Sequence, residues 1–132
     1  MSSLPFTQPI AKNTIARVLD SIYFMESNLL EGVASTKLGK IAGMSIASYQ
    51  RHFLELTHST PKEYLRGRRL NIAAERLLNS NRSVQHIAWD IGYGNVASFI
   101  RAFKAQFKTT PLQYRLAKID RWNWHQRKLE KG

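Results

Sequence analysis

The sequence has no cysteine, no long apolar run and few acidic residues, and each absence excludes a class of protein. Without cysteine, the 132-residue chain can form no disulfide, no thiolate zinc finger and no cysteine nucleophile. No segment is apolar over the length that a signal peptide or a membrane span requires. We therefore expect a cytoplasmic protein without a membrane partner.

The shortage of acidic residues leaves the chain strongly basic. Nine Asp and Glu residues stand against 20 Lys and Arg residues, for a formal net charge of +11 and a sequence pI of about 10.4. This balance favours a polyanionic partner, although charge alone does not separate DNA from RNA or an anionic membrane. Hydrophobic residues make up 43% of the chain, so we expect a folded core. The length suits one compact domain, or two small ones sharing a helix, without a separate sensor domain.

One short sequence unit occurs twice. The pairs that match at an offset of 50 are residues 46–53 with 96–103 and residues 60–61 with 110–111. Upstream, residues 38–39 match residues 87–88 at an offset of 49, so the second copy has one extra residue in its turn. We infer that one supersecondary unit is used twice.

Each copy has the pattern of a helix-turn-helix: a short helix, a turn with glycine, and a second helix that begins at a polar cap. In the first copy, Ser35 or Thr36 caps a helix to about Ala42, Gly43 forms the turn and Ser45 caps the next helix. In the second copy, the corresponding residues are Ser83 for the first cap, Ile91 for the helix end, Gly92 and Gly94 for the turn, and Asn95 for the second cap.

Apolar residues at helical spacing predict further helices around the two copies. A helix beginning at Asn13 or Thr14 should cover the first copy with an apolar stripe of Ile15, Val18, Leu19, Ile22 and Leu29. A connecting helix begins at Pro61 and spans roughly 27 Å at about 1.5 Å per residue. The predicted fold is all-α with about seven helices: a first helix-turn-helix subdomain over 13–60, a linker helix over 61–79, a second subdomain over 80–116 and a basic C-terminal tail over 117–132.

The second helix of each copy, residues 45–56 and 95–107, is a candidate recognition helix. At about 100° per residue, the aromatic side chains share one face, which we expect to be buried. The opposite face carries the small residues and multi-donor side chains that suit close approach to base edges in a major groove. The candidate base-reading residues are Ala47, Gln50, Arg51, Ala97, Ile100 and Arg101. The second set has fewer hydrogen-bonding groups, so we expect the second copy to read sequence more loosely.

Basic side chains near these helices are candidates for phosphate contact, which sets register without reading sequence. They are Lys37, Lys40, Arg66, Arg82, Lys104 and Lys108. Helical geometry spreads Arg66, Arg68 and Arg69 over more than one face, so at least one of them points to solvent or pairs with Glu63.

Three motifs in the second copy resemble the signature of the AraC/XylS family of transcription regulators. They are residues 83–93 (SVQHIAWDIGY), 99–104 (FIRAFK) and 110–115 (TPLQYR), and the resemblance extends from about Asn13 to Arg115. The chain looks most like the short stand-alone members of the MarA, SoxS and Rob type. The resemblance implies a monomer on an asymmetric duplex site of two major-groove segments, activation through RNA polymerase, and no cofactor.

Two features depart from the pattern of these short members. They have tryptophan where this chain has Ala47, and glutamine and threonine around Val96, Ala97 and Ile100, so their target site cannot be transferred. Gly39 replaces the alanine usual in the first helix of the unit, which we expect to loosen the packing there.

Two other classes of function remain to be weighed. A sequence-independent nucleoid or RNA-binding protein would share the charge, although RNA modules expose stacking aromatics that this repeat is expected to bury. An enzyme is disfavoured because the four histidines have neither metal-ligand spacing nor an evident carboxylate partner, and no catalytic motif is present. The tail that contains Trp122 and Trp124 has no predicted role beyond packing on the second unit, contacting polymerase, or forming a frayed helix.

Overall fold

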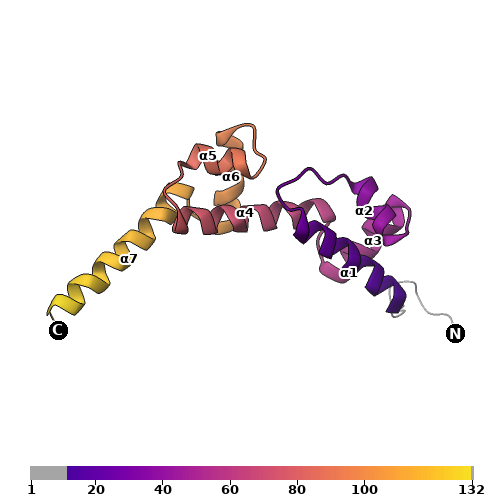
Figure 1. Cartoon of the computed structure of the whole chain (residues 1–132), viewed down its shortest axis with the longest axis horizontal. Coiled ribbons are helices and arrows are strands. Elements are labelled where there is room, and N and C mark those ends of the chain that lie inside the picture. The colour runs from indigo at the N-terminus through magenta and orange to yellow at the C-terminus, as the bar shows by residue number, and fades with distance from the viewer. Residues whose placement is uncertain (1–11, 132) are drawn as a thin grey trace. The chain divides into compact units, whose positions relative to one another are not determined.

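The computed structural model describes residues 12–131, without the side chains of residues 121–123 and 130–131. Within that range it contains seven helices and no strand (Figure 1), which confirms the all-α prediction. The helices are α1 (Lys12–Ser27), α2 (Ser35–Ala42), α3 (Ile46–Thr57), α4 (Pro61–Asn79), α5 (Val84–Asp90), α6 (Val96–Phe107) and α7 (Pro111–Lys131). The chain divides into two compact units, Met1–Leu65 and Arg66–Gly132, with the boundary inside α4.

The core of the first unit forms where α1, α2 and α3 pack together. Its largest fully buried side chains include Met25, Leu38, Tyr49 and Phe53. The Tyr49 hydroxyl donates to Ser21 Oγ at 2.8 Å, and Ser21 donates to a backbone carbonyl of its own helix at 2.6 Å. Burial raises the pKa of the Tyr49 phenol, and the hydrogen bond with Ser21 opposes part of that shift. The first unit therefore contains a satisfied polar pair at its centre.

The core of the second unit is entirely apolar and rich in aromatic rings. Its buried cluster is Leu70, Ala73, Ala74, Leu77, Ile87, Ala88, Ile91, Phe99 and Phe103. Phe103 is central, with ring centroids 4.5 Å from Phe107 and 5.4 Å from Tyr114. Phe99 occupies the position that matches Tyr49, so the second copy has no hydroxyl there.

The start of α4 at Pro61 agrees with the sequence prediction, and the repeat also extends to reciprocal caps that the sequence pattern did not reveal. Thr60 and Glu63 form reciprocal hydrogen bonds at the start of α4, and Thr110 and Gln113 do the same at the start of α7. Both recognition-helix candidates end at a non-glycine residue in the left-handed region, His58 (φ 63°) and Lys108 (φ 64°). The matched caps give both units the same backbone plan.

Two expectations about local structure are wrong, and the structure defines a third feature that the sequence left open. The N-cap of α2 is Ala34, and it makes no side-chain cap bond, because Ser35 already lies in the first turn. Leu19 is 56% exposed, and Ser21 takes a buried place on α1. Residues 117–131, for which the sequence left the structure open, continue α7 to Lys131. The side chain of Trp122 lies outside the described residues.

Candidate nucleic-acid interface

The first candidate recognition helix, α3, presents the face that the sequence predicted. Ser45 accepts a hydrogen bond from the Ser48 amide at 3.2 Å and so starts the helix as expected. Tyr49 and Phe53 are fully buried, and Ala47, Gln50 and Arg51 are exposed. Because the core anchors one face, the other projects the small residue and the two multi-donor side chains into solvent.

The second candidate recognition helix, α6, repeats this arrangement with one difference. Asn95 accepts hydrogen bonds from the amides of Ala97 and Ser98, which confirms the predicted cap. Ala97 and Arg101 are exposed, but Ile100 is half-buried and packs against the core of the second unit. Only part of the Ile100 side chain is therefore available to a thymine methyl group.

The turn between the two helices of each unit requires a glycine because its backbone there has a positive φ angle. Gly43 has φ 68° and Gly92 has φ 96°, values that residues with a side chain rarely adopt. In the first unit the turn lies directly on α2: a Cβ added to Gly39 would lie 3.2 Å from the carbonyl oxygen of Met44. Contrary to the expected loosening, Gly39 is buried and allows the close approach of helix and turn.

The two arginines that face outward have different partners. Arg51 Nε lies 3.7 Å from Glu55 Oε1. Arg101, at the matching position, donates from Nη2 to Ser98 Oγ at 3.2 Å. The sequence contained a signal for the first contact, because Arg51 and Glu55 are four residues apart on one helix.

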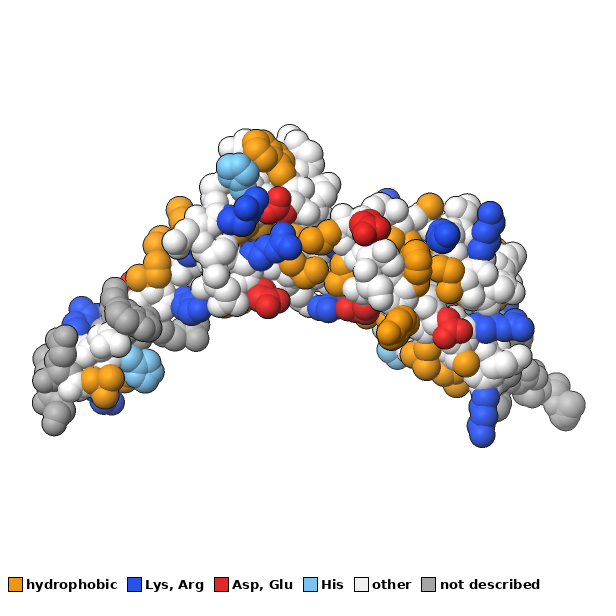
Figure 2. Space-filling view, viewed as in Figure 1, with side chains coloured by type: hydrophobic (Ala, Val, Ile, Leu, Met, Phe, Trp, Pro, Cys, Tyr) orange, Lys and Arg blue, Asp and Glu red, His pale blue; other side chains and the backbone are white. Residues whose placement is uncertain are grey.

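The candidate phosphate contacts are mostly exposed. Lys37, Lys40, Arg66, Lys104 and Lys108 are all in that class. Lys37 lies over the ring of Phe24 at 5.9 Å, and Lys108 donates to a carbonyl oxygen of α6 at 3.0 Å. Figure 2 shows basic side chains on the surface of each unit, interspersed with acidic side chains.

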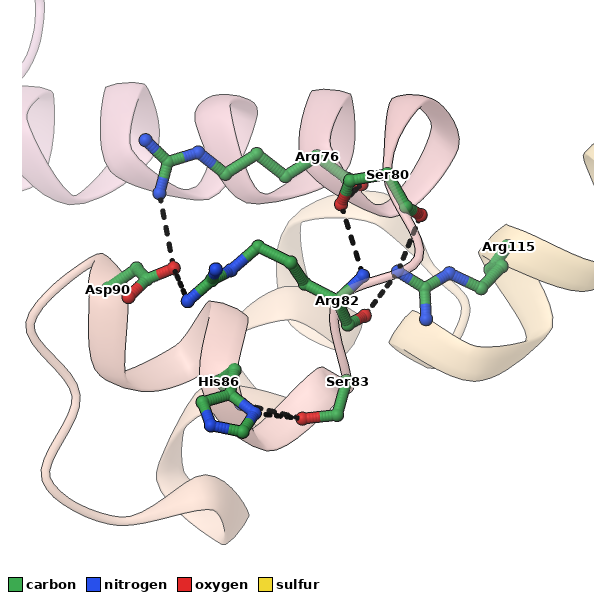
Figure 3. Close-up of polar contacts among 7 residues, drawn as sticks. All are labelled: Arg76, Ser80, Arg82, Ser83, His86, Asp90 and Arg115. Atoms are coloured by element: carbon green, nitrogen blue, oxygen red, sulfur yellow. Dashed lines mark hydrogen bonds and ion pairs between the residues drawn. The ribbon is translucent and has the colours of Figure 1, made fainter.

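Arg82 has a structural partner that the sequence did not reveal. Its Nη2 lies 2.8 Å from Asp90 Oδ2, and Arg76 Nη1 lies 3.6 Å from the same oxygen (Figure 3). Half of the Arg82 side chain remains exposed, so the group can still face a phosphate while the carboxylate orients it. Asp90, at the end of α5, therefore contacts α4 through Arg76 and the α4–α5 connection through Arg82.

Arg115, from the family-like motif, binds backbone carbonyls within the second unit (Figure 3). Its guanidinium donates to the carbonyl oxygens of Leu77 at 2.9 Å, Ser80 at 3.3 Å and Arg82 at 2.6 Å. A cation at these carbonyls also complements the negative end of the α4 dipole. This contact holds the segment that leads into the second helix-turn-helix. Local sequence patterns do not reveal it, because Arg115 lies far along the chain from the carbonyls that it binds.

The described residues contain no other constellation that indicates chemistry. Among them there is no group of three or more His, Asp or Glu side chains placed to hold a metal ion. None of the helices in the described part of the chain is long and apolar enough to cross a membrane.

Comparison with known proteins identifies relatives over most of this chain. A family model described as a helix-turn-helix domain matches residues 38–117. The regulatory protein SoxS of Escherichia coli (strain K12) is 35% identical over 98 residues, which cover 74% of this chain and 92% of SoxS. The virulence regulon transcriptional activator VirF of Yersinia enterocolitica is 31% identical over 96 residues, which cover 73% of this chain and 35% of VirF.

A solved structure that contains a target DNA also matches. The DNA-binding domain of AdpA, a global transcriptional factor crystallised with a target DNA, superposes with a TM-score of 0.73 at 27% identity. The match covers 80% of this chain and 95% of that domain.

Proposed function

We propose, from the premise that this chain belongs to the AraC/XylS family of DNA-binding transcription regulators, that α3 and α6 read successive major-groove segments of an asymmetric site. One observation carries the proposal. Both helices begin at a capped N-terminus, bury an aromatic face and expose alanine followed four residues later by arginine. A helix of this kind can approach base edges closely and donate to guanine.

The two helices make unequal contributions to specificity. Gln50 and Arg51 offer donors for adenine and guanine, each worth about 1–3 kcal/mol of discrimination. In α6, Ile100 replaces the glutamine and is partly withdrawn into the core. The first unit therefore carries most of the sequence preference, while Lys37, Lys40, Arg66, Arg82, Lys104 and Lys108 bind phosphates.

The wider role follows from the family and extends to steps beyond DNA binding. The chain acts as a transcription activator in the cytoplasm, binds DNA as a monomer and contacts RNA polymerase. It catalyses no reaction and needs no cofactor. The similarity to VirF, a transcriptional activator, supports the activator role. Transcription in vitro from a promoter that carries the selected site tests it, because an activator raises the yield and a repressor lowers it.

Selection of binding sites from a random duplex library tests the reading roles directly. The purified chain, Arg51→Ala and Arg101→Ala are compared, with Arg17→Ala on the exposed surface of α1 as the charge-matched control. We expect a two-part motif, spaced by about one helical turn of DNA, from which each reading variant removes a different part. The Arg17→Ala variant should retain the whole motif.

The same selection decides against the competing function. A sequence-independent binder would give no motif, and its affinity for any duplex would fall steeply with salt. If all four proteins select no preferred sequence while binding strongly at low salt, the activator proposal is wrong.

A further inference from the structure

The matched arginines Arg51 and Arg101 lie in different electrostatic environments. Arg51 is 64% exposed as a side chain and lies beside the Glu55 carboxylate. The position that matches Glu55 in the second copy is Ala105, and the position that matches His52 is Ala102. The first unit therefore has an acid and an imidazole beside its arginine where the second unit has two methyl groups.

His52 lies near both Arg51 and Glu55. Arg51 Nη2 lies 3.5 Å from His52 Nε2, and His52 Nδ1 lies 3.9 Å from Glu55 Oε1. A guanidinium has only donors, so the imidazole nitrogen that faces it must be the acceptor. The other ring nitrogen, Nδ1, is buried without a hydrogen bond among the described residues and faces the Glu55 oxygen that also faces Arg51 Nε.

The local helix alone does not explain this arrangement. Ser48 in the first copy matches Ser98 in the second, so a serine hydroxyl is present three residues before each arginine. Arg101 turns back to that serine, toward the start of its helix. Arg51 instead contacts Glu55, four residues further on. Arg51 has two contacts that Arg101 lacks, with Glu55 and His52, and of these only Glu55 is a negatively charged partner for the guanidinium.

We propose that Glu55 is a specificity-determining residue that keeps Arg51 on base edges and away from phosphates; this rests on the function proposed above. The carboxylate faces the Nε side of Arg51, and the terminal nitrogens are the edge that pairs with O6 and N7 of guanine. An arginine on a phosphate adds affinity for every sequence equally. A carboxylate beside it opposes that contact because it repels the phosphate oxygens.

Reciprocal substitutions in the two units provide the test. Glu55→Gln keeps the shape of the side chain and removes its charge, and Ala105→Glu places an acid beside Arg101. Asp20→Asn and Ala16→Glu make the same charge changes at exposed positions of α1 and serve as controls. Each protein is measured by fluorescence anisotropy on its selected site and on a random duplex, over a series of salt concentrations.

We expect Glu55→Gln to bind random duplex about eightfold more tightly at 0.1 M salt, because one additional phosphate contact releases about 0.9 counterion. The slope of log affinity against log salt should steepen by about 0.9. Discrimination against a changed base should fall at the Arg51 position alone, by about fivefold or more. Ala105→Glu should shift the random-duplex affinity and the slope in the opposite direction, and neither control should match these changes.

The outcomes separate this inference from the proposed function. If the unmodified chain selects no preferred site, the proposed function fails. If it selects a site but Glu55→Gln equals Asp20→Asn in slope and in discrimination, Glu55 does not determine specificity. Equal weakening on both duplexes, with a lower melting temperature, would also overturn the inference by assigning Glu55 a purely structural role.

Discussion

The two helix-turn-helix units share one backbone plan but differ in where their polar contacts lie, in the core of the first unit and at the periphery of the second. In the first unit the polar pair is central, where Tyr49 and Ser21 are both fully buried and hydrogen-bonded at 2.8 Å. In the second unit the core is apolar, and polar contacts lie at the periphery through Asp90 and Arg115. Matched caps and turns therefore repeat the backbone, while each unit is stabilised by its own side chains.

The largest expected effect is the loss of the Arg115 contacts in the second unit. Arg115→Ala should lower the free energy of unfolding by about 2 kcal/mol, because charge-assisted hydrogen bonds to partly buried carbonyls are lost. Chemical denaturation gives the change, and amide hydrogen exchange should locate it in the second unit. Arg127→Ala, on the exposed surface of α7, is the control. Equal loss of protection in both units would contradict a contact confined to one of them.

The next effect concerns the buried pair of the first unit. Ser21→Ala should destabilise the chain by about 1.5 kcal/mol, because it leaves the Tyr49 hydroxyl buried without a partner. Tyr49→Phe should cost less, about 1 kcal/mol, since Ser21 keeps its bond to the backbone. The double variant should be less destabilised than the sum of the single variants. Additive effects in the denaturation cycle would show that the pair is not coupled.

Alkaline titration sharpens the contrast between Tyr49 and Phe99. Below the ordinary tyrosine pKa of 10.0, Tyr49 holds its proton in both the folded and the unfolded state. At higher pH the unfolded chain ionises while burial keeps the folded phenol neutral, because its pKa is raised. Stability is therefore lost as pH rises above that value, by up to about 1.4 kcal/mol per pH unit from this residue.

The Tyr49→Phe variant isolates that contribution. Its stability difference from the unmodified chain should shrink between about pH 9 and pH 11, because the variant has no phenol at this position. Denaturation at a series of pH values measures the difference. A gap that stays constant over this range would mean that burial of Tyr49 does not alter its ionisation.

The smallest expected effect is the gain in stability when glycine replaces the C-cap residue of α3 or α6, a position that both units share. His58 and Lys108 occupy the left-handed region with φ near 63° and 64°, where glycine is favoured. His58→Gly should raise the free energy of unfolding by up to about 1 kcal/mol. Lys108→Gly should gain less, because it also loses the amine bond to the end of α6. A larger gain at Lys108 would reverse this ranking.

Much of the fold and part of the candidate site could be predicted from local pattern. The caps at Ser45, Ser83 and Asn95, the turn at Gly43 and the buried aromatic faces depend on residues within a few positions of one another. Such signals survive in sequence because helical periodicity and end capping are local physics. The base-reading and phosphate-binding assignments stay predictions, since exposure alone does not identify a contact.

The features that the sequence did not predict have separate causes. Ala34 caps α2 only because the chain enters the helix one residue earlier than its hydroxyls suggested. Gly39 interpreted alone indicated loose packing, but the turn that lies on it is visible only in three dimensions. The continuation of α7 through Trp124 has no strong apolar period to announce it.

By itself, the sequence determined the all-helical class, the twofold use of one helix-turn-helix unit, the family, and which faces of α3 and α6 point outward. Each of these depends on spacing along one helix or on the repeat itself. Only the tertiary structure decided that Ser21 satisfies Tyr49, that Asp90 holds Arg82, and that Arg115 binds the carbonyls after α4. These contacts join residues that are distant in sequence, and their energies depend on burial and distance, which a linear pattern does not contain.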